Sequence, residues 1–140
     1  GFSGVDNTEI AYVCDVDKNR LAGGIKYAAG KQAGKEPRGV TDFREILDDK
    51  EVDVLAIAAP NFWHTPAAIL ACDAGKHVYV EKPGSHNAHE SQLIVKAARD
   101  NNRLVQMGNQ RRSLPAFREG IEKIRAGRSA VVVTTPPKKD

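Results

Sequence analysis

Short β-prone runs alternate with helical patterns along this chain, and this alternation constrains the fold more than any other feature of the sequence. We expect strands over residues 9–14, 39–41, 52–59, 77–81, 104–107 and 130–135. We expect helices over residues 18–29, 42–49, 65–74, 87–101 and 114–126. Each strand and its helix take about 20 to 25 residues, which favours parallel strands joined by right-handed crossovers. The alternation therefore predicts an α/β fold with a doubly wound parallel sheet.

Apolar runs and capping residues refine this pattern at individual elements. Residues 52–59 are nearly continuously apolar, which is typical of a parallel strand covered on both faces. Asp17 is expected to cap the helix that follows it, and either Thr41 or Asp42 is expected to cap the next one. Pro66 is expected in the first turn of its helix, where a missing N–H costs little.

The length and charge of the chain limit the classes of protein that it can represent. A chain of 140 residues is long enough for one compact domain. Its net charge of +3 comes from scattered Lys and Arg, without the interleaved aromatic residues typical of nucleic-acid binding. No apolar run approaches the roughly 18 residues that a membrane span needs. We therefore expect neither nucleic-acid nor membrane partners.

The two cysteines and four histidines give no metal-binding pattern. Cys14 and Cys72 have no CxxC spacing, so buried free thiols are favoured over a disulfide or a metal site. None of the histidines has the spacing of a zinc site, and no metal is expected. The chain shows no signal peptide, which predicts a cytoplasmic protein, or a periplasmic or secreted one if a signal peptide precedes the first residue.

The run over residues 77–81 stops abruptly on charged residues. Pro83 cannot donate to a sheet ladder, so Glu81 and Lys82 are expected at the carboxyl end of the strand, where open α/β sheets bind ligands. Lys82 could donate hydrogen bonds to a substrate hydroxyl and stabilise a developing alkoxide, with Glu81 positioning it. The alternative is a solvated ion pair at a surface strand end.

Asp15 ends the first expected strand and immediately precedes a helix. In dinucleotide-binding folds, an acid at this point binds the ribose hydroxyls, about 20 residues after a glycine-rich phosphate loop. Counting back places that loop before residue 1, so the chain is expected to begin inside or after its first crossover helix. The alternative for Asp15 is a helix cap, for which Asp17 is better placed. An acid here repels the 2′-phosphate of NADP and favours NAD, although nearby Arg20 leaves NADP open.

Further candidates follow two other expected strands at the same edge: Ala59, Pro60, Asn61 and His64 after residues 52–59, and Asn109 and Arg111 after residues 104–107. Small residues in the first group permit close approach of a cofactor. His64 is either a ligand contact or a polar residue near the following helix. Asn109 and Arg111 either contact a ligand or cap the sheet. We assign Asn109 and Glu81 to the cofactor side and Arg111 to the substrate side.

Three motifs, APNFWH, AGKHVYVEKP and GNQR, resemble the N-terminal domain of the glucose-fructose oxidoreductase, inositol dehydrogenase and MocA family. The resemblance extends from residue 9 to about 127. GKHV followed by EKP, at this distance from PNxxH, is a specific combination, whereas EKP alone is not. The resemblance implies a Rossmann-like fold and NAD(P)-dependent oxidation or reduction of a sugar, cyclitol or related polyol. It also implies Lys82 at the substrate hydroxyl, Asp15 at the ribose, and Pro60, Asn61 and His64 beside the nicotinamide.

The chain departs from this family pattern in two respects. Family members carry the glycine-rich loop on a first strand that lies centrally, between the strand ending at Asp15 and residues 52–59, and this sequence lacks it. They also have a second α/β domain that binds substrate and supplies a histidine as general base. Residues 1–127 are thus expected to be a partial NAD(P)-binding domain, and residues 128–140 the start of a connection to the second domain.

The resemblance also carries expectations for the full-length protein. Family members often associate through the open sheet of the second domain, so we expect a homo-oligomer. Some members use NAD as a transient redox partner to hydrolyse glycosides, which is an alternative to a dehydrogenase. A third alternative is a sensing protein that kept the nucleotide fold without turnover.

Overall fold

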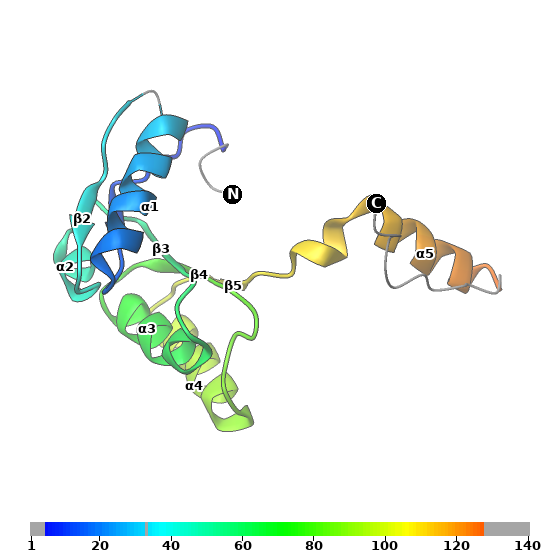
Figure 1. Ribbon diagram of the computed structural model, residues 1–140. Coiled ribbons are helices and arrows are strands. Elements are labelled where there is room, and N and C mark those ends of the chain that lie inside the picture. Colours follow the sequence, from blue (N-terminus) through cyan, green and yellow to red (C-terminus); the bar gives the residue numbers. More distant parts are fainter. Residues whose placement is uncertain (1–4, 33, 128–140) are drawn as a thin grey trace. The chain divides into compact units, whose positions relative to one another are not determined.

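The computed structural model describes residues 5–32 and 34–127, which fall into two compact units that divide after Met107. In the first unit (Figure 1) the elements are β1 (Tyr12–Cys14), α1 (Lys18–Lys31), β2 (Arg38–Val40), α2 (Arg44–Asp48), β3 (Val54–Ile57), α3 (Asn61–Asp73), β4 (His77–Val80), α4 (Ala88–Asp100) and β5 (Val105–Met107). The second unit contains a 3-10 helix (Gln110–Ser113) and α5 (Pro115–Arg125). The strand predicted over residues 130–135 and the connection predicted over 128–140 lie outside the described residues.

All strand pairs in the first unit are parallel, which confirms the predicted α/β class. They form two sheets, β1–β2 and β3–β4–β5. The N–H groups of His77 and Glu81 donate to the carbonyls of Asp53 and Ile57. Because backbone groups alternate in direction along a parallel strand, the peptide groups of Val54 and Ala56 face the opposite edge of β3. Within the described residues no ladder joins that edge to β1.

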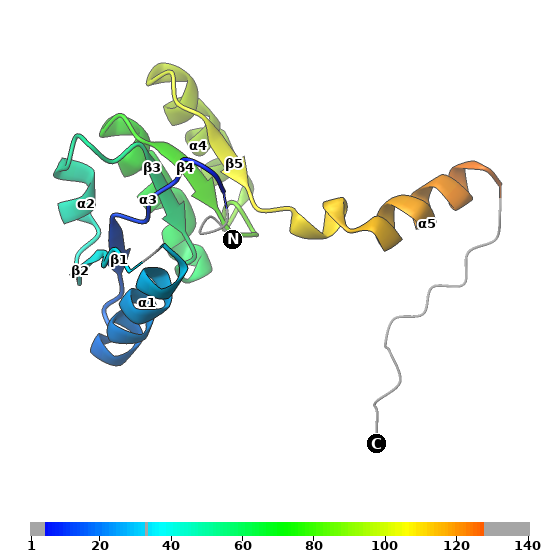
Figure 2. The same ribbon diagram turned by 90° about the horizontal axis from the view of Figure 1, so that it is seen from above.

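Helices cover one face of the three-stranded sheet. Figures 1 and 2 show α3 and α4 side by side against β3, β4 and β5. The core between them is apolar and includes Leu55, Ile57, Ala68, Ala71, Cys72, Val78 and Val80. On the other face Val54 is 48% exposed and Ala56 is exposed as well. The prediction that residues 52–59 are covered on both faces is therefore wrong for this structure, because α3 and α4 lie on the same side.

Three contacts show that the two sheets run in the same direction. At their amino ends, the Tyr12 hydroxyl donates to Asp49 Oδ2 at 2.8 Å, and the buried Lys76 donates from Nζ to the Asp49 carbonyl at 2.5 Å. At their carboxyl ends, the rings of Phe43 and Trp63 meet edge to face with centroids 6.3 Å apart. Tyr12 and Lys76 lie at strand starts, since Tyr12 opens β1 and Lys76 precedes β4. Phe43 and Trp63 lie beyond strand ends, after β2 and β3. The carboxyl ends of all the strands therefore share one edge.

Two helix starts differ from the predictions. Helix α3 begins at Asn61 and not at residue 65, because the extended Pro60 ends the strand connection and its carbonyl accepts from Trp63 N at 2.8 Å. Pro66 therefore lies inside the helix, where its missing N–H removes one bond from the ladder. Phe43 precedes α2 without a side-chain cap. The Asp42 carboxylate instead accepts from Arg44 N at 3.0 Å and forms a local turn.

The two cysteines lie in different environments, and both are free thiols. Cys72 is fully buried inside α3, as predicted. The prediction of a buried Cys14 is wrong, because β1 pairs with β2 and packs on α1 in a way that leaves Cys14 exposed. None of the helices within residues 5–32 and 34–127 has the length and apolarity needed to cross a membrane.

Candidate active site

Lys82 stands at the shared carboxyl edge, one residue after Glu81. Glu81 N donates to the Ile57 carbonyl at 2.9 Å, which continues the β3–β4 pairing by one residue beyond β4. Lys82 N lies 3.3 Å from Glu81 Oε2, and the residue is exposed. The strand thus ends on an accessible ammonium group, as the position of Pro83 predicted.

The backbone that follows Lys82 is held from two sides. From the first turns of α3, Thr65 Oγ1 donates to the Gly84 carbonyl at 3.5 Å. His64 Nδ1 lies 2.5 Å from the Pro83 carbonyl oxygen. From β5, Met107 Sδ accepts from Gly84 N at 3.1 Å. His64 and Thr65 are each only 1% exposed. A Cβ at Gly84 would lie 3.1 Å from the same sulfur, so the loop fits closely between α3 and β5.

The end of β3 lies beside this loop. His64 Nε2 lies 2.8 Å from the Ala59 carbonyl, so one imidazole ring touches both strand ends. Ala59, Pro60 and Asn61 are all exposed, and Asn61 is the first residue of α3. Small side chains at Ala59 and its neighbour Ala58 leave this part of the edge open to a flat ring. His64 itself is enclosed, and its ring nitrogens face backbone carbonyls.

Asp15 follows β1 directly and is half-buried. Its Oδ1 accepts from Asp17 N at 2.9 Å. The capping role falls to Asp17, whose Oδ1 accepts from Asn19 N at 2.8 Å and Arg20 N at 3.3 Å. The prediction that Asp17 caps α1 is therefore confirmed, and Oδ2 of Asp15 can accept a hydrogen bond from a ligand hydroxyl.

Carboxylates gather near the ends of β1 and β2. Partial desolvation of the sulfur raises the pKa of the Cys14 thiol, although the residue as a whole is exposed, and the negative charges of Asp15, Asp42 and Glu45 raise it further. The Arg44 guanidinium hydrogen-bonds to Asp42 and lowers the pKa of that carboxyl to about 2. Arg44 pairs with Asp42 and Arg38 pairs with Glu45 at 2.9 Å, so Asp15 is the carboxylate at the end of β1 that a further anion would meet.

Asn109 and Arg111 belong to the second unit and are described within it. Asn109 precedes the 3-10 helix and accepts from Arg112 N at 2.9 Å through its carbonyl. Arg111 lies inside that helix, and both residues are exposed. Their assignments to cofactor and substrate stay predictions.

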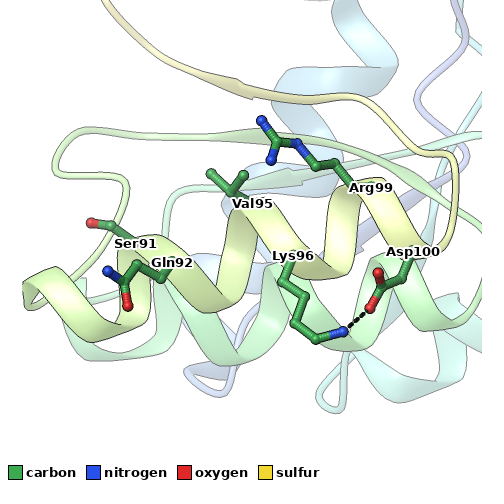
Figure 3. A pocket seen from close by; sticks show the side chains of 6 residues that line it. All are labelled: Ser91, Gln92, Val95, Lys96, Arg99 and Asp100. Atoms are coloured by element: carbon green, nitrogen blue, oxygen red, sulfur yellow. Dashed lines mark hydrogen bonds and ion pairs between the residues drawn. The ribbon is translucent and has the colours of Figure 1, made fainter.

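A surface depression on α4 lies apart from these residues (Figure 3). All six of its lining residues come from that one helix: Ser91, Gln92, Val95, Lys96, Arg99 and Asp100. Lys96 forms an ion pair with Asp100 within it. No strand end contributes to the depression. Within residues 5–32 and 34–127, no group of three or more His, Cys, Asp or Glu is placed to hold a metal ion.

The sequence predictions missed two residues that hold the Lys82 loop, Thr65 and Met107. Thr65 follows His64 in the chain, and a threonine in an apolar helix gives no signal of its own. Met107 ends β5, which pairs with β4. A prediction of this pairing from the sequence would have placed Met107 near Gly84, and no other feature of the sequence indicates the contact.

Comparison with known proteins identifies relatives of the whole first unit. Residues 3–109 match the model of an oxidoreductase family with an NAD-binding Rossmann fold. Inositol 2-dehydrogenase of Salmonella typhimurium is 34% identical over 110 residues, which are 77% of this chain and 31% of that protein. A glycosyl hydrolase family 109 protein of Saccharopolyspora erythraea is 33% identical over 112 residues, 77% of this chain and 24% of that protein.

A solved structure shows the same arrangement of elements. Levoglucosan dehydrogenase in complex with NADH and levoglucosan is 28% identical and superposes with a TM-score of 0.67, over 85% of this chain and 30% of that one. The chain spans about a third or less of the length of these relatives. Because the family match covers most of the residues, the chain belongs to the GFO/IDH/MocA oxidoreductase family and corresponds to its N-terminal NAD-binding Rossmann domain.

Proposed function

We propose that the protein containing this chain is an NAD-dependent oxidoreductase that transfers a hydride between nicotinamide and a hydroxyl-bearing carbon of a sugar, cyclitol or related polyol. The observation that carries the proposal is the exposed Lys82 at the carboxyl end of β4, with its loop held beside the end of β3. The inositol and levoglucosan dehydrogenases among its relatives support this substrate class.

The residues at the shared edge fit an NAD dinucleotide. Asp15 offers a carboxylate oxygen at the end of β1, where ribose hydroxyls need an acceptor. Ala59, Pro60 and Asn61 offer an exposed surface of small side chains for the nicotinamide side. The carboxylate of Asp15 favours NAD over NADP, because a 2′-phosphate would place a second negative charge beside it. We also assign Asn109 to the cofactor and Arg111 to the substrate.

Lys82 acts on the substrate oxygen in this proposal. Bound NAD would supply the hydride acceptor for the substrate carbon, and the hydroxyl proton would pass to the general base that the family pattern places in the second domain. The Lys82 ammonium donates a hydrogen bond to the oxygen on that carbon and favours the negative charge that develops there. Glu81 lies next to Lys82 in sequence and orients its backbone through the Lys82 N–H.

Substitution of Lys82 tests this role in the full-length protein. We expect Lys82→Ala to lower turnover roughly 10²- to 10³-fold, as removal of one donor to a developing oxyanion does. NAD affinity should change much less, since the cofactor is held by other residues. Turnover is measured by NADH absorbance with polyol substrates, and affinity by calorimetry.

Lys50→Ala is the matched control, because Lys50 is an exposed lysine in the turn before β3, at the opposite edge of the sheet. It removes the same charge and should leave both quantities unchanged. An equal loss of turnover and NAD affinity in Lys82→Ala would move Lys82 from chemistry to cofactor binding.

A second candidate function is glycoside hydrolysis with NAD as a transient redox partner. The relative named as a glycosyl hydrolase family 109 protein supports it, at 33% identity over 112 residues. Incubation with an aryl glycoside and with free polyols separates the two. Accumulation of NADH with a polyol supports the dehydrogenase, whereas release of the aryl group without net NADH supports the hydrolase. A protein that binds NAD without either reaction would be a sensor.

A further inference from the structure

Aromatic side chains gather at the carboxyl edge of the first unit, where α3 begins. Phe62 is 58% exposed and Trp63 is 45% exposed, and their ring centroids lie 6.3 Å apart with the planes tilted by 44°. Phe43, which follows β2, meets the Trp63 ring edge to face at the same centroid distance, with 69° between the planes. Large apolar side chains that stay exposed side by side are typical of a ligand-binding surface.

The Trp63 ring and the His64 ring face different parts of this edge. Neighbouring residues of an α-helix point about 100° apart around the helix axis. His64 is enclosed, with Nδ1 at the Pro83 carbonyl, whereas the ring of Trp63 contacts Phe43. The indole therefore lies toward the end of β2, while its neighbour faces the Lys82 loop.

A short series of contacts connects the aromatic side chains to Asp15. Asp15 N donates to the Val40 carbonyl at 3.2 Å, so the ends of β1 and β2 lie side by side. Phe43 comes shortly after Val40 and carries the contact to Trp63. Val16, the residue directly after Asp15, is 85% exposed. The carboxylate assigned to the ribose thus has an exposed apolar neighbour in sequence and an aromatic contact on the adjoining strand end.

The chemistry of NAD restricts what can bind beside this carboxylate. Adenine is attached directly to the ribose whose hydroxyls fit Asp15, so a ribose bound there brings a planar base to the same part of the edge. Every base has a π-face that stacks on an aromatic side chain. A polyol has no such face, and its reacting oxygen is assigned to Lys82.

We propose that the adenine ring of NAD stacks on Trp63, and that Phe43 holds the indole in place for this contact. Phe43 is half-buried and packs against the hydrophobic core of the first unit. Its edge-to-face contact therefore orients an indole that is still nearly half exposed. The inference rests on the proposed function for NAD as the ligand, but it concerns affinity and not turnover.

Calorimetry on the full-length protein tests the stacking with Trp63→Leu. We expect the dissociation constants for NAD and for ADP to rise roughly 5- to 100-fold, as loss of the stacking of one base does. The dissociation constant for nicotinamide mononucleotide, which lacks adenine, should change less than about twofold. Tyr27→Leu is the matched control, because Tyr27 is a 64% exposed aromatic residue well inside α1. It should match the wild-type protein with all three ligands.

Two other roles of Trp63 predict different results. A purely structural role predicts equal losses of affinity for ADP and for nicotinamide mononucleotide, which would overturn the proposal. A contact with the substrate predicts a raised KM for polyols with unchanged affinity for NAD and ADP, which would overturn it as well. Trp63→Phe keeps an aromatic face and should bind ADP within about fivefold of the wild-type protein.

Fluorescence decides the proposal if Trp63→Leu does not fold. Trp63 is the one tryptophan among the 140 residues, and the difference between the spectra of the wild-type protein and Trp63→Phe isolates its emission. ADP should quench this emission, and nicotinamide mononucleotide should not. An emission that ADP leaves unchanged would contradict the stacking. Absence of turnover with every polyol would instead contradict the proposed function and would leave these binding results unaffected.

Discussion

At the scale of single residues, Gly75 shows how one conformation places a buried charge. It follows α3 with φ of +77°, in the left-handed region that favours glycine. Lys76 N donates back to the Ala71 carbonyl at 2.8 Å, which closes the helix end and turns the chain toward β4. Lys76 is then 4% exposed, with its ammonium on the Asp49 carbonyl. The left-handed turn at Gly75 thus delivers Lys76 to the junction between the sheets.

Replacement of Gly75 by alanine should destabilise the protein, whereas the same replacement of a glycine inside a helix should stabilise it. A Cβ at Gly75 would meet nothing within 4 Å, so the cost of Gly75→Ala is conformational, about 1 to 2 kcal/mol. Gly23 lies inside α1 and also has open space at its Cβ. Gly23→Ala should therefore stabilise the protein by about 0.5 to 1 kcal/mol. Urea denaturation of both variants measures the difference, and a shift of the same sign in both would contradict this account.

The residue-level predictions from sequence succeeded where a single residue dictates local backbone. Pro83 ends a strand in any surroundings because it lacks an N–H, and Asp17 caps α1 with its own carboxylate. The environment of Cys14 could not be predicted in the same way, because its exposure depends on which elements cover β1.

At the scale of elements, Asp49 joins the two sheets at their amino ends. Its carboxylate accepts from the Tyr12 hydroxyl of β1, and its carbonyl accepts from Lys76, which precedes β4. Hydrogen bonds from the Glu51 N–H and then the Tyr12 hydroxyl lower the pKa of Asp49. The Tyr12 contact of this junction is therefore strongest when Asp49 is ionised, whereas the Lys76 contact uses the backbone carbonyl.

Tyr12→Phe should weaken this junction in a pH-dependent manner. The folded-state pKa of Asp49 lies below its unfolded value of about 3.9, so its stabilising contribution is present above that value and is lost as pH falls through the folded-state pKa. The denaturation midpoint of Tyr12→Phe should thus lie below that of the wild-type protein at pH 7, and the difference should shrink below about pH 4.

Tyr27→Phe is the matched control for this experiment. Tyr27 is 64% exposed on α1, and loss of its hydroxyl should leave the midpoint unchanged at both pH values. A Tyr12→Phe difference that stays constant from pH 7 to pH 3 would show that the hydroxyl acts independently of Asp49 ionisation.

Element boundaries were harder to predict than element types. The apolar and helical periods in the sequence correctly indicated strands and helices in the order observed. The start of α3 was predicted four residues late, since Pro60-Asn61 reads as a loop and Pro60, which precedes the helix, offers no side-chain cap. The first turn of α3 forms because Pro60, Trp63 and the buried His64 fit the end of β3.

At the scale of the whole molecule, two sheets run in one direction with a free edge on β3. The peptide groups of Val54 and Ala56 face away from β4, and in the described residues no strand pairs with them. The family pattern places the strand that carries the glycine-rich loop between β1 and β3. That strand would use this edge and bring the phosphate-binding loop beside Asp15.

We therefore expect the 140-residue chain by itself to bind NAD weakly or not at all. The dinucleotide phosphates depend on N–H groups of a glycine-rich loop at a helix N-terminus, and this sequence contains no such loop. Calorimetry with the isolated chain and with the full-length protein measures the difference. Micromolar affinity in the isolated chain would contradict the expectation and would locate phosphate binding in residues 1–140.

The sequence by itself determined the parallel α/β class and the position of Lys82 at a strand end. Both follow from local rules, the period of apolar residues and the missing N–H of proline. Only the tertiary structure decided that His64 is enclosed and that one ring touches both strand ends. Its carbonyl partners, Ala59 and Pro83, lie 5 and 19 residues away along the chain. The packing of α3 on β3 and β4 brings them together, and no periodicity in the sequence encodes that distance.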